Sequence, residues 1–310
     1  MTSIRSTLLA SAASLAMAGS AAANCDSVTF SDVGWTDITA TTAATTLVLD
    51  ALGYETDIKV LSVPVTYTSL AEGDIDVFLG NWMPTMEADI APYREAGTVD
   101  TVRANLEGAK YTLATNAQGA ALGITSFGTI ADQAEALERE IYGIEPGNDG
   151  NRLIMEMIES GAFGLDGFEV VESSEQGMLA QVGRAVRREE PIVFLAWEPH
   201  PMNANYDITY LTGGDDWFGP NLGGATVYTN TRAGYVEDCP NVGQFLQNLE
   251  FTLAMENEIM GAILNDGEDP QDAARAWISA NPDALDAWLD GVQTAGGEDG
   301  LAAVRAELGL

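Results

Sequence analysis

Short apolar segments alternate with longer segments of helical character along the chain, and this alternation limits the possible folds more than any other feature. Strands that are separated by helices build a sheet whose faces the helices cover. The sequence therefore predicts an α/β fold with parallel-type strands. The expected strands are 28–33, 58–63, 75–79, 110–115, 141–144, 192–196, 208–211 and 225–230, and the expected helices are 38–52, 84–94, 130–140, 150–160, 176–187 and 242–264, with a helical tail over 270–310.

The first 23 residues have the layout of a secretory signal peptide. Arg5 precedes an apolar run around 8–17, and the small residues 19–23 end in an Ala-x-Ala-type cleavage site before Asn24. The apolar run is too short to span a bilayer. A lipoprotein signal needs a small residue before Cys25, and Asn24 stands there instead. We therefore expect an exported, periplasmic, soluble protein.

The charge and the cysteines narrow the class of protein further. The chain has 47 acidic and 13 basic residues, a formal net charge of −34, and such a surface repels nucleic acid and anionic lipid. About 287 residues remain after the signal peptide, enough for one large or two medium domains. Cys25 and Cys239 would meet an oxidising compartment, so we expect a disulfide between them; two buried thiols are the alternative.

The segment 30–37 ends a predicted strand with a tryptophan and a carboxylate, Trp35 and Asp37. Ligands of α/β folds bind where the carboxyl end of a strand opens into a helix. The two residues are two positions apart, so a continued extended backbone would turn both side chains to one side. A π face beside a negative charge suits an organic cation. The alternative is a buried tryptophan beside a helix-capping aspartate.

Two later segments share one pattern. In 77–84 and 193–199, an apolar strand ends in a tryptophan, Trp82 or Trp197, and a proline then forces a turn. Two similar lobes that each present a tryptophan to the cleft between them would produce this pattern, and clefts between domains are preferred sites for small ligands. Chance similarity of two buried strands is the alternative. Packing roles are assigned to the tryptophans outside this context, Trp217, Trp277 and Trp288.

Motifs of enzymes and metal sites are largely missing from the sequence. The one histidine, His200, lies between two prolines, and nucleophile-elbow, His-Glu-x-x-His and phosphate-loop motifs do not occur. The glycine-containing stretch 143–150 lacks the dinucleotide spacing, and its Asn148 suits either a helix N-cap or an amide turned into a cleft. The acidic loop 265–269 lacks the spacing of a calcium loop and is interpreted as solvated surface. We expect no catalysis, no metal and no cofactor.

Several longer phrases resemble the glycine-betaine/choline substrate-binding family of ABC transporters. They are 30–39, 66–70, 78–84, 109–115, 142–150 and 194–205. The resemblance extends over essentially the whole mature chain. It implies the two-lobed periplasmic substrate-binding fold of type II, with a ligand cleft between the lobes. The implied division is a signal peptide over 1–23, lobe I over 24–112 and 210–310, and lobe II over 113–209.

The resemblance also implies a ligand and the residues that bind it. In that family the lobes close on a quaternary ammonium group inside an aromatic box. The implied set is Trp35, Trp82, Tyr111 and Trp197 for the box, Asp37 for the balancing charge and Asn148 for the hydroxyl of choline. A bridge between Cys25 and Cys239 is implied as well. The implied partners are choline and the permease of an ABC transporter in the inner membrane, and the protein is expected to be a monomer.

The chemistry of a quaternary ammonium group accounts for such a box. The group has no N–H to donate, and its diffuse charge is covered by methyl groups, which suit aromatic ring faces. Each desolvated ring contributes up to about 2 kcal/mol, so four rings reach roughly 6 to 8 kcal/mol before the costs of binding. The favoured function is choline capture. The alternatives are another quaternary ammonium or methylamine, such as glycine betaine, trimethylamine oxide or acetylcholine, and, more remotely, an exported choline-ester hydrolase, for which His200 has no evident nucleophile partner.

Overall fold

A computed structural model describes residues 25–310. The predicted signal peptide lies outside the described residues. Among the helices of residues 25–310, none is both long and apolar enough for a bilayer crossing.

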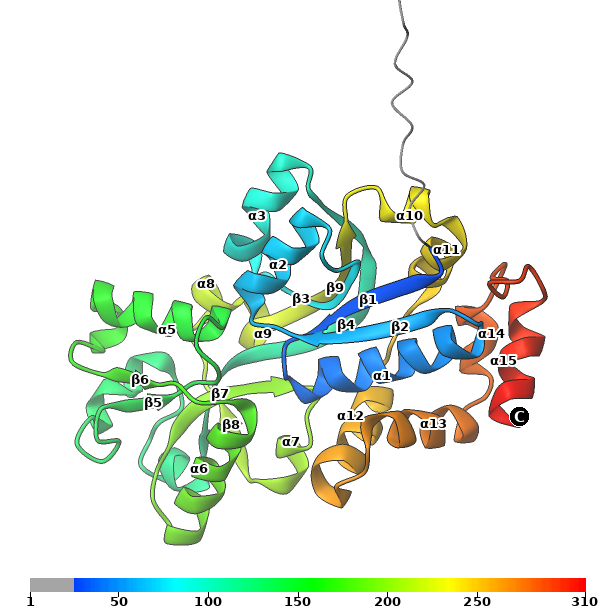
Figure 1. Ribbon diagram of the computed structural model, residues 1–310. Helices are drawn as coiled ribbons and strands as arrows, with labels where there is room; N and C mark the ends of the chain where they lie inside the picture. The colour runs from blue at the N-terminus through cyan, green and yellow to red at the C-terminus, as the bar shows by residue number, and fades with distance from the viewer. Residues whose placement is uncertain (1–24) are drawn as a thin grey trace, which may run out of the picture.

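One curled sheet of nine strands runs through the molecule (Figure 1). Its order is β2-β1-β3-β9-β4-β7-β5-β6, and β8 pairs with β4 beside this path. The strands are β1 (Ser27–Asp32), β2 (Glu55–Val60), β3 (Val77–Met83), β4 (Val99–Asn116), β5 (Glu140–Tyr142), β6 (Glu169–Val171), β7 (Val193–Glu198), β8 (Ile208–Tyr210) and β9 (Gly224–Arg232). The α/β class predicted from the sequence is confirmed.

The expected parallel pairing holds only at the two ends of the sheet. β1 runs parallel to β2 and β3, and β5 runs parallel to β6 and β7. In the centre, β9 is antiparallel to β3 and β4, and β4 is antiparallel to β7 and β8. The expectation of parallel strands is therefore wrong there, because β9 returns late in the chain and enters the sheet between two earlier strands.

The helices pack around this sheet on both sides. They are α1 (Thr36–Ala51), α2 (Val63–Glu72), α3 (Glu87–Ala96), α4 (Ala117–Ala121), α5 (Asp149–Ser160), α6 (Glu175–Arg188), α7 (Met202–Asn205), α8 (Asp215–Phe218), α9 (Pro220–Gly223), α10 (Tyr235–Asp238), α11 (Pro240–Asn248), α12 (Leu253–Gly261), α13 (Pro270–Ala280), α14 (Ala284–Trp288) and α15 (Gly300–Leu308). The helix expected over 130–140 is wrong. One short 3₁₀ turn (Ala131–Gln133) and a later turn with positive φ at Glu138 and Arg139 occupy that segment.

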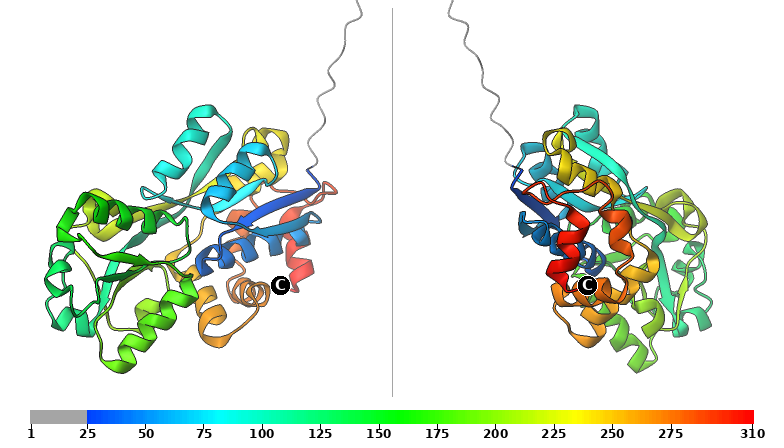
Figure 2. Two further views of the ribbon diagram at one scale, coloured as in Figure 1. Left: turned by 60° about the vertical axis from the view of Figure 1, so that its left-hand side comes forward. Right: turned by 90° about the vertical axis from the view of Figure 1, so that its right-hand side faces the viewer.

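The molecule has two lobes that share β4 (Figure 1). We use "first lobe" for β1–β3 with α1–α3 and the C-terminal helices, and "second lobe" for β5–β8 with α5–α7. β4 pairs with β9 up to Lys110 and with β7 from Lys110 onward. Figure 2 shows the C-terminal helices beside α1, on the side of the first lobe that faces away from α5 and β6.

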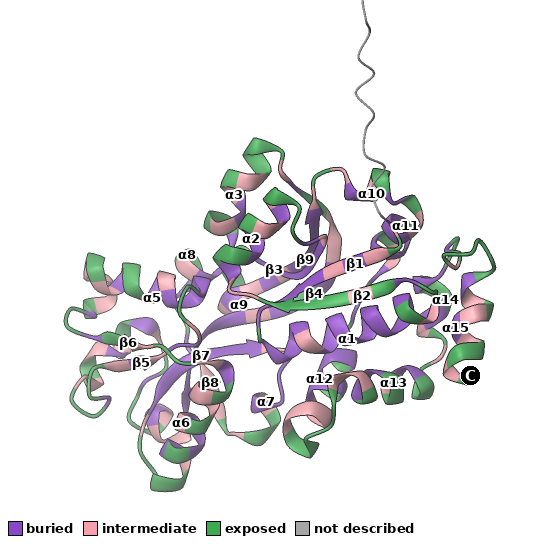
Figure 3. Ribbon diagram, in the orientation of Figure 1, coloured by how far each residue is buried: buried purple, intermediate pink, exposed green. Residues whose placement is uncertain are grey.

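Helix α1 is the buried centre of the first lobe. Its residues from Thr36 to Leu49 are almost all buried (Figure 3), and it packs against α12, α13 and α15. Several of its threonine hydroxyls donate to carbonyls one turn earlier, as in Thr45 to Thr41 at 2.7 Å, so these buried hydroxyls keep hydrogen bonds. The packing fixes the position of the helix N-terminus, which faces the second lobe.

The two cysteines form the expected bridge. Cys25 and Cys239 are disulfide-bonded with a Cα–Cα distance of 5.5 Å. The bond ties the chain just before β1 to the chain just before α11, and both of these elements belong to the first lobe.

Candidate ligand-binding site

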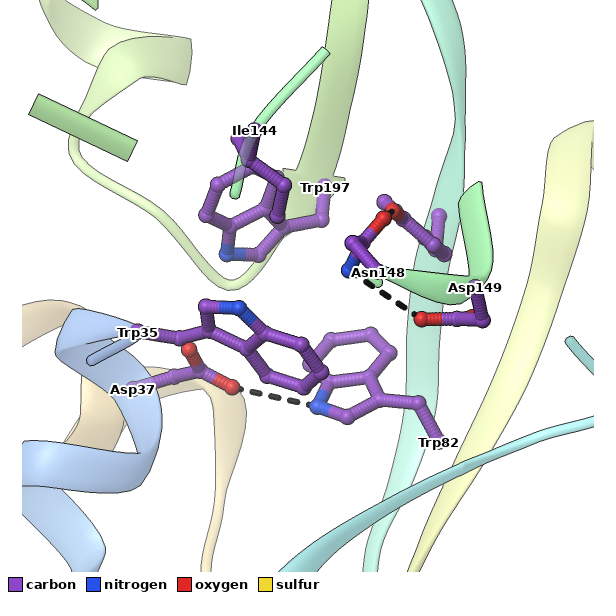
Figure 4. Close-up of a pocket in the computed structure, with 8 residues that line it drawn as sticks. Trp35, Asp37, Trp82, Ile144, Asn148, Asp149 and Trp197 are labelled. Atoms are coloured by element: carbon purple, nitrogen blue, oxygen red, sulfur yellow. Dashed lines mark hydrogen bonds between the residues drawn. The ribbon is translucent and has the colours of Figure 1, made fainter. Parts of the chain in front are cut away.

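A cavity lies between the lobes, and all six residues predicted as ligand-binding line it (Figure 4). The space between its walls is about 260 Å³, including space open to solvent. Ile144 and Asp149 also line it, and sequence reasoning missed both. The lining residues are Trp35, Asp37, Trp82, Tyr111, Ile144, Asn148, Asp149 and Trp197.

The start of α1 brings Trp35 and Asp37 to the cavity. Trp35 is the last extended residue, with φ −89° and ψ 134°, and Asp37 lies in the first helical turn. The backbone therefore does not stay extended from Trp35 to Asp37, yet both side chains line the same cavity. The indole nitrogen of Trp35 donates to Glu145 Oε1 of the second lobe over 2.8 Å.

Asp37 keeps one carboxylate oxygen free. Its Oδ2 accepts from Trp82 Nε1 at 3.1 Å, whereas the buried Oδ1 has no hydrogen-bond partner in the described part of the chain. Burial, with a further contribution from the charge of Glu175, raises the pKa of Asp37 to about 8. A cation in the cavity would favour the ionised form and lower this pKa.

The two strand-end tryptophans enter the cavity from different strands, as their shared sequence pattern predicts. Trp82 lies in β3 and Trp197 in β7, and each is followed, two residues later, by a proline with a cis peptide bond. The ring of Tyr111 in β4 lies 6.2 Å from each of them, centroid to centroid, in edge-on geometry. The ring of Tyr111 thus contacts both tryptophans in the lining of the cavity.

The other tryptophans pack elsewhere, as expected. Trp277 and Trp288 stack on each other with ring centroids 6.4 Å apart. Trp217 is half-buried against the core. The acidic loop 265–269 is exposed, as the sequence suggests.

Asn148 fills both roles between which the sequence could not decide. Its Oδ1 caps α5 by accepting from the Asn151 N–H at 3.1 Å, and it also accepts from the Tyr111 hydroxyl at 2.8 Å. Its Nδ2 donates to Asp149 Oδ1 at 3.1 Å. The amide oxygen is therefore occupied, and one amide N–H remains for a ligand.

Acidic groups dominate the surroundings of the cavity, and neither lysine nor arginine is among its lining residues within 25–310. Burial raises the pKa of Asp149 to about 6 and that of Glu145 to about 7. Burial also raises the pKa of Glu256, on α12, well above its usual range, and the charge of Asp37 adds to the shift. Such an arrangement destabilises anions and favours a positive charge.

Hydrogen bonds between the lobes hold this cavity closed. The backbone N–H and the hydroxyl of Thr36, at the start of α1, donate to the buried carboxylate of Glu175 at 2.7 and 2.6 Å. Arg152 donates to Asp89 Oδ2 at 2.9 Å and to the carbonyl of Thr85 at 3.1 Å. Together with Trp35 and Glu145, these pairs join α1 and α3 to the second lobe.

His200 forms a hydrogen bond with Glu175. Its Nδ1 accepts from the Met202 N–H at 2.9 Å, so Nε2 carries the proton and donates to Glu175 Oε1 at 3.0 Å. Sequence reasoning gave His200 no structural role, because Glu175 lies 25 residues away. No group of three or more His, Cys, Asp or Glu side chains suited to a metal ion occurs across residues 25–310.

The chain is similar to proteins of one transport family. Residues 26–280 match the family described as the substrate-binding domain of ABC-type glycine betaine transport systems. A solved structure of an ABC-transporter choline binding protein in complex with choline is 71% identical, with a TM-score of 0.91 over 92% of this chain and 98% of that chain.

Two further relatives extend the comparison. An ABC-transporter choline binding protein in an unliganded semi-closed conformation is also 71% identical, with a TM-score of 0.86 over 93% of this chain and 100% of that chain. The glycine betaine/carnitine transport binding protein GbuC of Listeria monocytogenes is 30% identical over 168 residues, which are 54% of this chain and 55% of that protein.

Proposed function

Because this chain belongs to the family of substrate-binding domains of ABC-type glycine betaine transport systems, we propose that it captures choline and delivers it to the permease of an ABC transporter. The observation that carries this proposal is the cavity itself: four aromatic rings and an unpartnered carboxylate oxygen, enclosed between two lobes. The choline complex that is 71% identical supports the same ligand.

Each lining residue has a role in this proposal. The rings of Trp35, Trp82, Tyr111 and Trp197 surround the trimethylammonium group, which binds ring faces because it cannot donate an N–H. The free oxygen of Asp37 balances the positive charge. The remaining amide N–H of Asn148 donates to the ligand's hydroxyl. Closure then adds the hydrogen bonds between the lobes to the contacts that the ligand makes.

The cavity favours choline over glycine betaine. A betaine pocket needs donors where the ligand carboxylate lies. Here Arg152 is held by Asp89 and Thr85, and Lys110 pairs with Glu198 at 2.8 Å. Both basic groups are therefore committed outside the cavity.

We propose binding without catalysis. Both ring nitrogens of His200 are engaged, by Glu175 and by the Met202 N–H, and both cysteines are in the disulfide. Neither the histidine nor a cysteine is therefore free to act as the base or the nucleophile of an activated pair. Export to the periplasm is proposed from the leader-like residues 1–23. The lobe boundaries are proposed at 112/113, near the point where β4 changes its pairing partner, and at 209/210, within β8.

Calorimetry of the mature protein tests the function. Choline, glycine betaine, trimethylamine oxide and carnitine are titrated in parallel, and choline should bind at least tenfold more tightly than glycine betaine. Tryptophan fluorescence should respond to choline, and acetylcholine should not be hydrolysed. Absence of choline binding, or turnover of acetylcholine, would overturn the proposal.

A further inference from the structure

The single histidine of the chain, His200, is not among the residues that line the cavity, yet its ring is held in one orientation. The residue is 1% exposed and stands between Pro199 and Pro201, which restrict the backbone on both sides. The Met202 N–H donates to Nδ1 at 2.9 Å. The other ring nitrogen, Nε2, is thereby directed at Glu175.

Glu175 receives hydrogen bonds from both lobes. From the first lobe, the backbone N–H of Thr36 donates to Oε2 at 2.7 Å and the Thr36 hydroxyl donates to Oε1 at 2.6 Å. From the second lobe, His200 Nε2 donates to Oε1 at 3.0 Å. Glu175 begins α6 and belongs to the second lobe itself. Separation of the lobes would therefore leave His200 as the one donor to this carboxylate within residues 25–310.

The carboxylate of Glu175 is not needed to cap its own helix. Ser174 caps α6, because its hydroxyl accepts from the Gly177 N–H at 3.0 Å. Other carboxyl groups surround the position: burial raises the pKa of Asp32 and of Glu145, and the charge of Glu175 contributes to both shifts. Glu175 is 1% exposed, and a buried carboxylate in such surroundings is costly unless donors hold it.

We propose that His200 is a positioning residue for lobe closure, which holds the Glu175 carboxylate at the place where Thr36 of the first lobe meets it. The inference rests on the proposed function, in which closure retains choline in the cavity. An acceptor that is already in place lowers the ordering cost of closure. Loss of the His200 donor should therefore shorten the time for which choline stays bound.

A second contact of His200 provides a competing explanation. Its ring lies edge-on to the ring of Trp197, with the centroids 4.8 Å apart, and Trp197 lines the cavity. If His200 acted on choline by shaping the aromatic box, its effect would not pass through Glu175. The two explanations predict opposite results for two substitutions of the histidine.

The substitutions are His200→Phe and His200→Gln. His200→Phe keeps a ring beside Trp197 and removes the donor, whereas His200→Gln keeps an N–H donor near the position of Nε2 and removes the ring. Stopped-flow tryptophan fluorescence measures the choline dissociation rate. We expect His200→Phe to raise this rate about fivefold or more and His200→Gln to stay within about twofold of the wild type. Equal rates in the two variants, or the reverse order, would overturn the proposal.

A double-mutant cycle with Glu175→Gln tests the route of the effect. Glu175→Gln removes the charge at nearly constant shape and should itself speed dissociation. The added His200→Phe should change the rate of that variant by no more than about twofold. Effects that multiply would show that His200 acts independently of Glu175, and the proposal would be wrong. If thermal melting shows that His200→Phe does not fold, His200→Leu, which also removes the donor, takes its place.

Controls separate this inference from the proposed function. Gln176→Ala changes the neighbouring position of α6, where the side chain is exposed, and should leave the dissociation rate within about twofold. A His200→Phe variant that released choline at the wild-type rate would contradict this inference alone. A wild-type protein that failed to bind choline would instead overturn the proposed function.

Discussion

At the residue scale, Asp37 combines a functional charge with an unfavourable position. The carboxylate is 1% exposed and has one unpartnered oxygen. A bound cation would interact with the oxygen that has no partner within the protein. The protonation state of Asp37 and the binding of a cationic ligand are therefore linked.

This linkage predicts that choline binding depends on pH. Burial raises the pKa of Asp37 to about 8, and the cation binds the ionised form, so the affinity is complete above that pKa and falls as the pH decreases through it. The loss approaches about tenfold per pH unit, until the pKa of the complex is reached. Calorimetry between about pH 6 and pH 9 checks this.

Asp37→Asn provides the comparison for the pH series. The variant should bind choline more weakly than the wild type at high pH, and its affinity should change much less with pH. A wild-type affinity that stayed constant over the whole range would contradict the placement of this carboxylate beside the cation.

The box itself predicts the effect of removing a ring. Trp82→Ala and Trp197→Ala should each weaken choline binding about tenfold or more, because one desolvated ring contributes about 1 to 2 kcal/mol. Trp277→Ala is the control, since that ring stacks on Trp288 and is hydrogen-bonded to Glu258, away from the cavity. Equal losses at all three positions would show that the box is misassigned.

Residue types at strand ends were predictable, whereas their partners were not. Trp82 and Trp197 follow apolar strands and precede prolines, which is a local pattern. Asp149 directly follows Asn148, and its place after a strand and at a helix start was the available signal. Glu175 and Thr36 lie 139 residues apart, and no sequence pattern joins residues that meet only when two lobes close.

At the scale of secondary-structure elements, the N-terminus of α1 is where the lobes meet. A helix start leaves backbone N–H groups without partners, and one of them, that of Thr36, is satisfied by Glu175 at the start of α6. The negative charge also interacts favourably with the positive end of the α1 dipole. The second lobe thus supplies the acceptor for an N–H group at the start of α1, and this hydrogen bond favours the closed arrangement of the lobes.

Loss of one of these bonds should speed ligand release. Thr36→Val removes the hydroxyl donor at nearly constant shape, and a hydrogen bond to a charged group contributes about 1.5 to 3 kcal/mol. The choline dissociation rate, followed by stopped-flow tryptophan fluorescence, should rise about tenfold or more, with a smaller change in the association rate. Thr36→Ser keeps the hydroxyl and should resemble the wild type; similar rates in all three proteins would argue against this contact as a closure element.

The elements were more predictable than their arrangement. Strands and helices with strong periodicity, such as β7 and α6, lie close to their expected bounds. The failures have physical causes. The segment 130–140 has helical composition, but it forms a 3₁₀ turn at Ala131–Gln133 followed by turns, and positive φ values at Glu138 and Arg139 prevent a helix from continuing beyond residue 137. The antiparallel position of β9 depends on tertiary packing that no local pattern encodes.

At the scale of the whole molecule, the two-lobed organisation was implied by the resemblance and agrees with the observed fold. The boundary between the lobes is harder to assign from sequence, since β4 runs through both without a turn. Because the chain passes from one lobe to the other within a single strand, no linker of distinctive composition marks the boundary in the sequence.

The disulfide predicts a stability effect that is separate from function. It closes a loop with a sequence separation of 214, for which chain entropy gives at most about 5 kcal/mol. Reduction should lower the Tm by roughly 5 °C or more, and choline binding should largely remain, because both cysteines belong to the first lobe. Calorimetric melting with and without reductant measures this; two titratable thiols in the native, unreduced protein would contradict it.

The division of the aromatic box between two lobes has a kinetic consequence. Trp35 and Trp82 belong to the first lobe and Trp197 to the second, so the ligand cannot leave without separation of the walls that hold it. The residence time of the cargo then equals the waiting time for an opening motion. A membrane partner that pulled the lobes apart would release the ligand without contacting it. The residues of the cavity would then decide which ligand is bound, and the partner would decide when it is released.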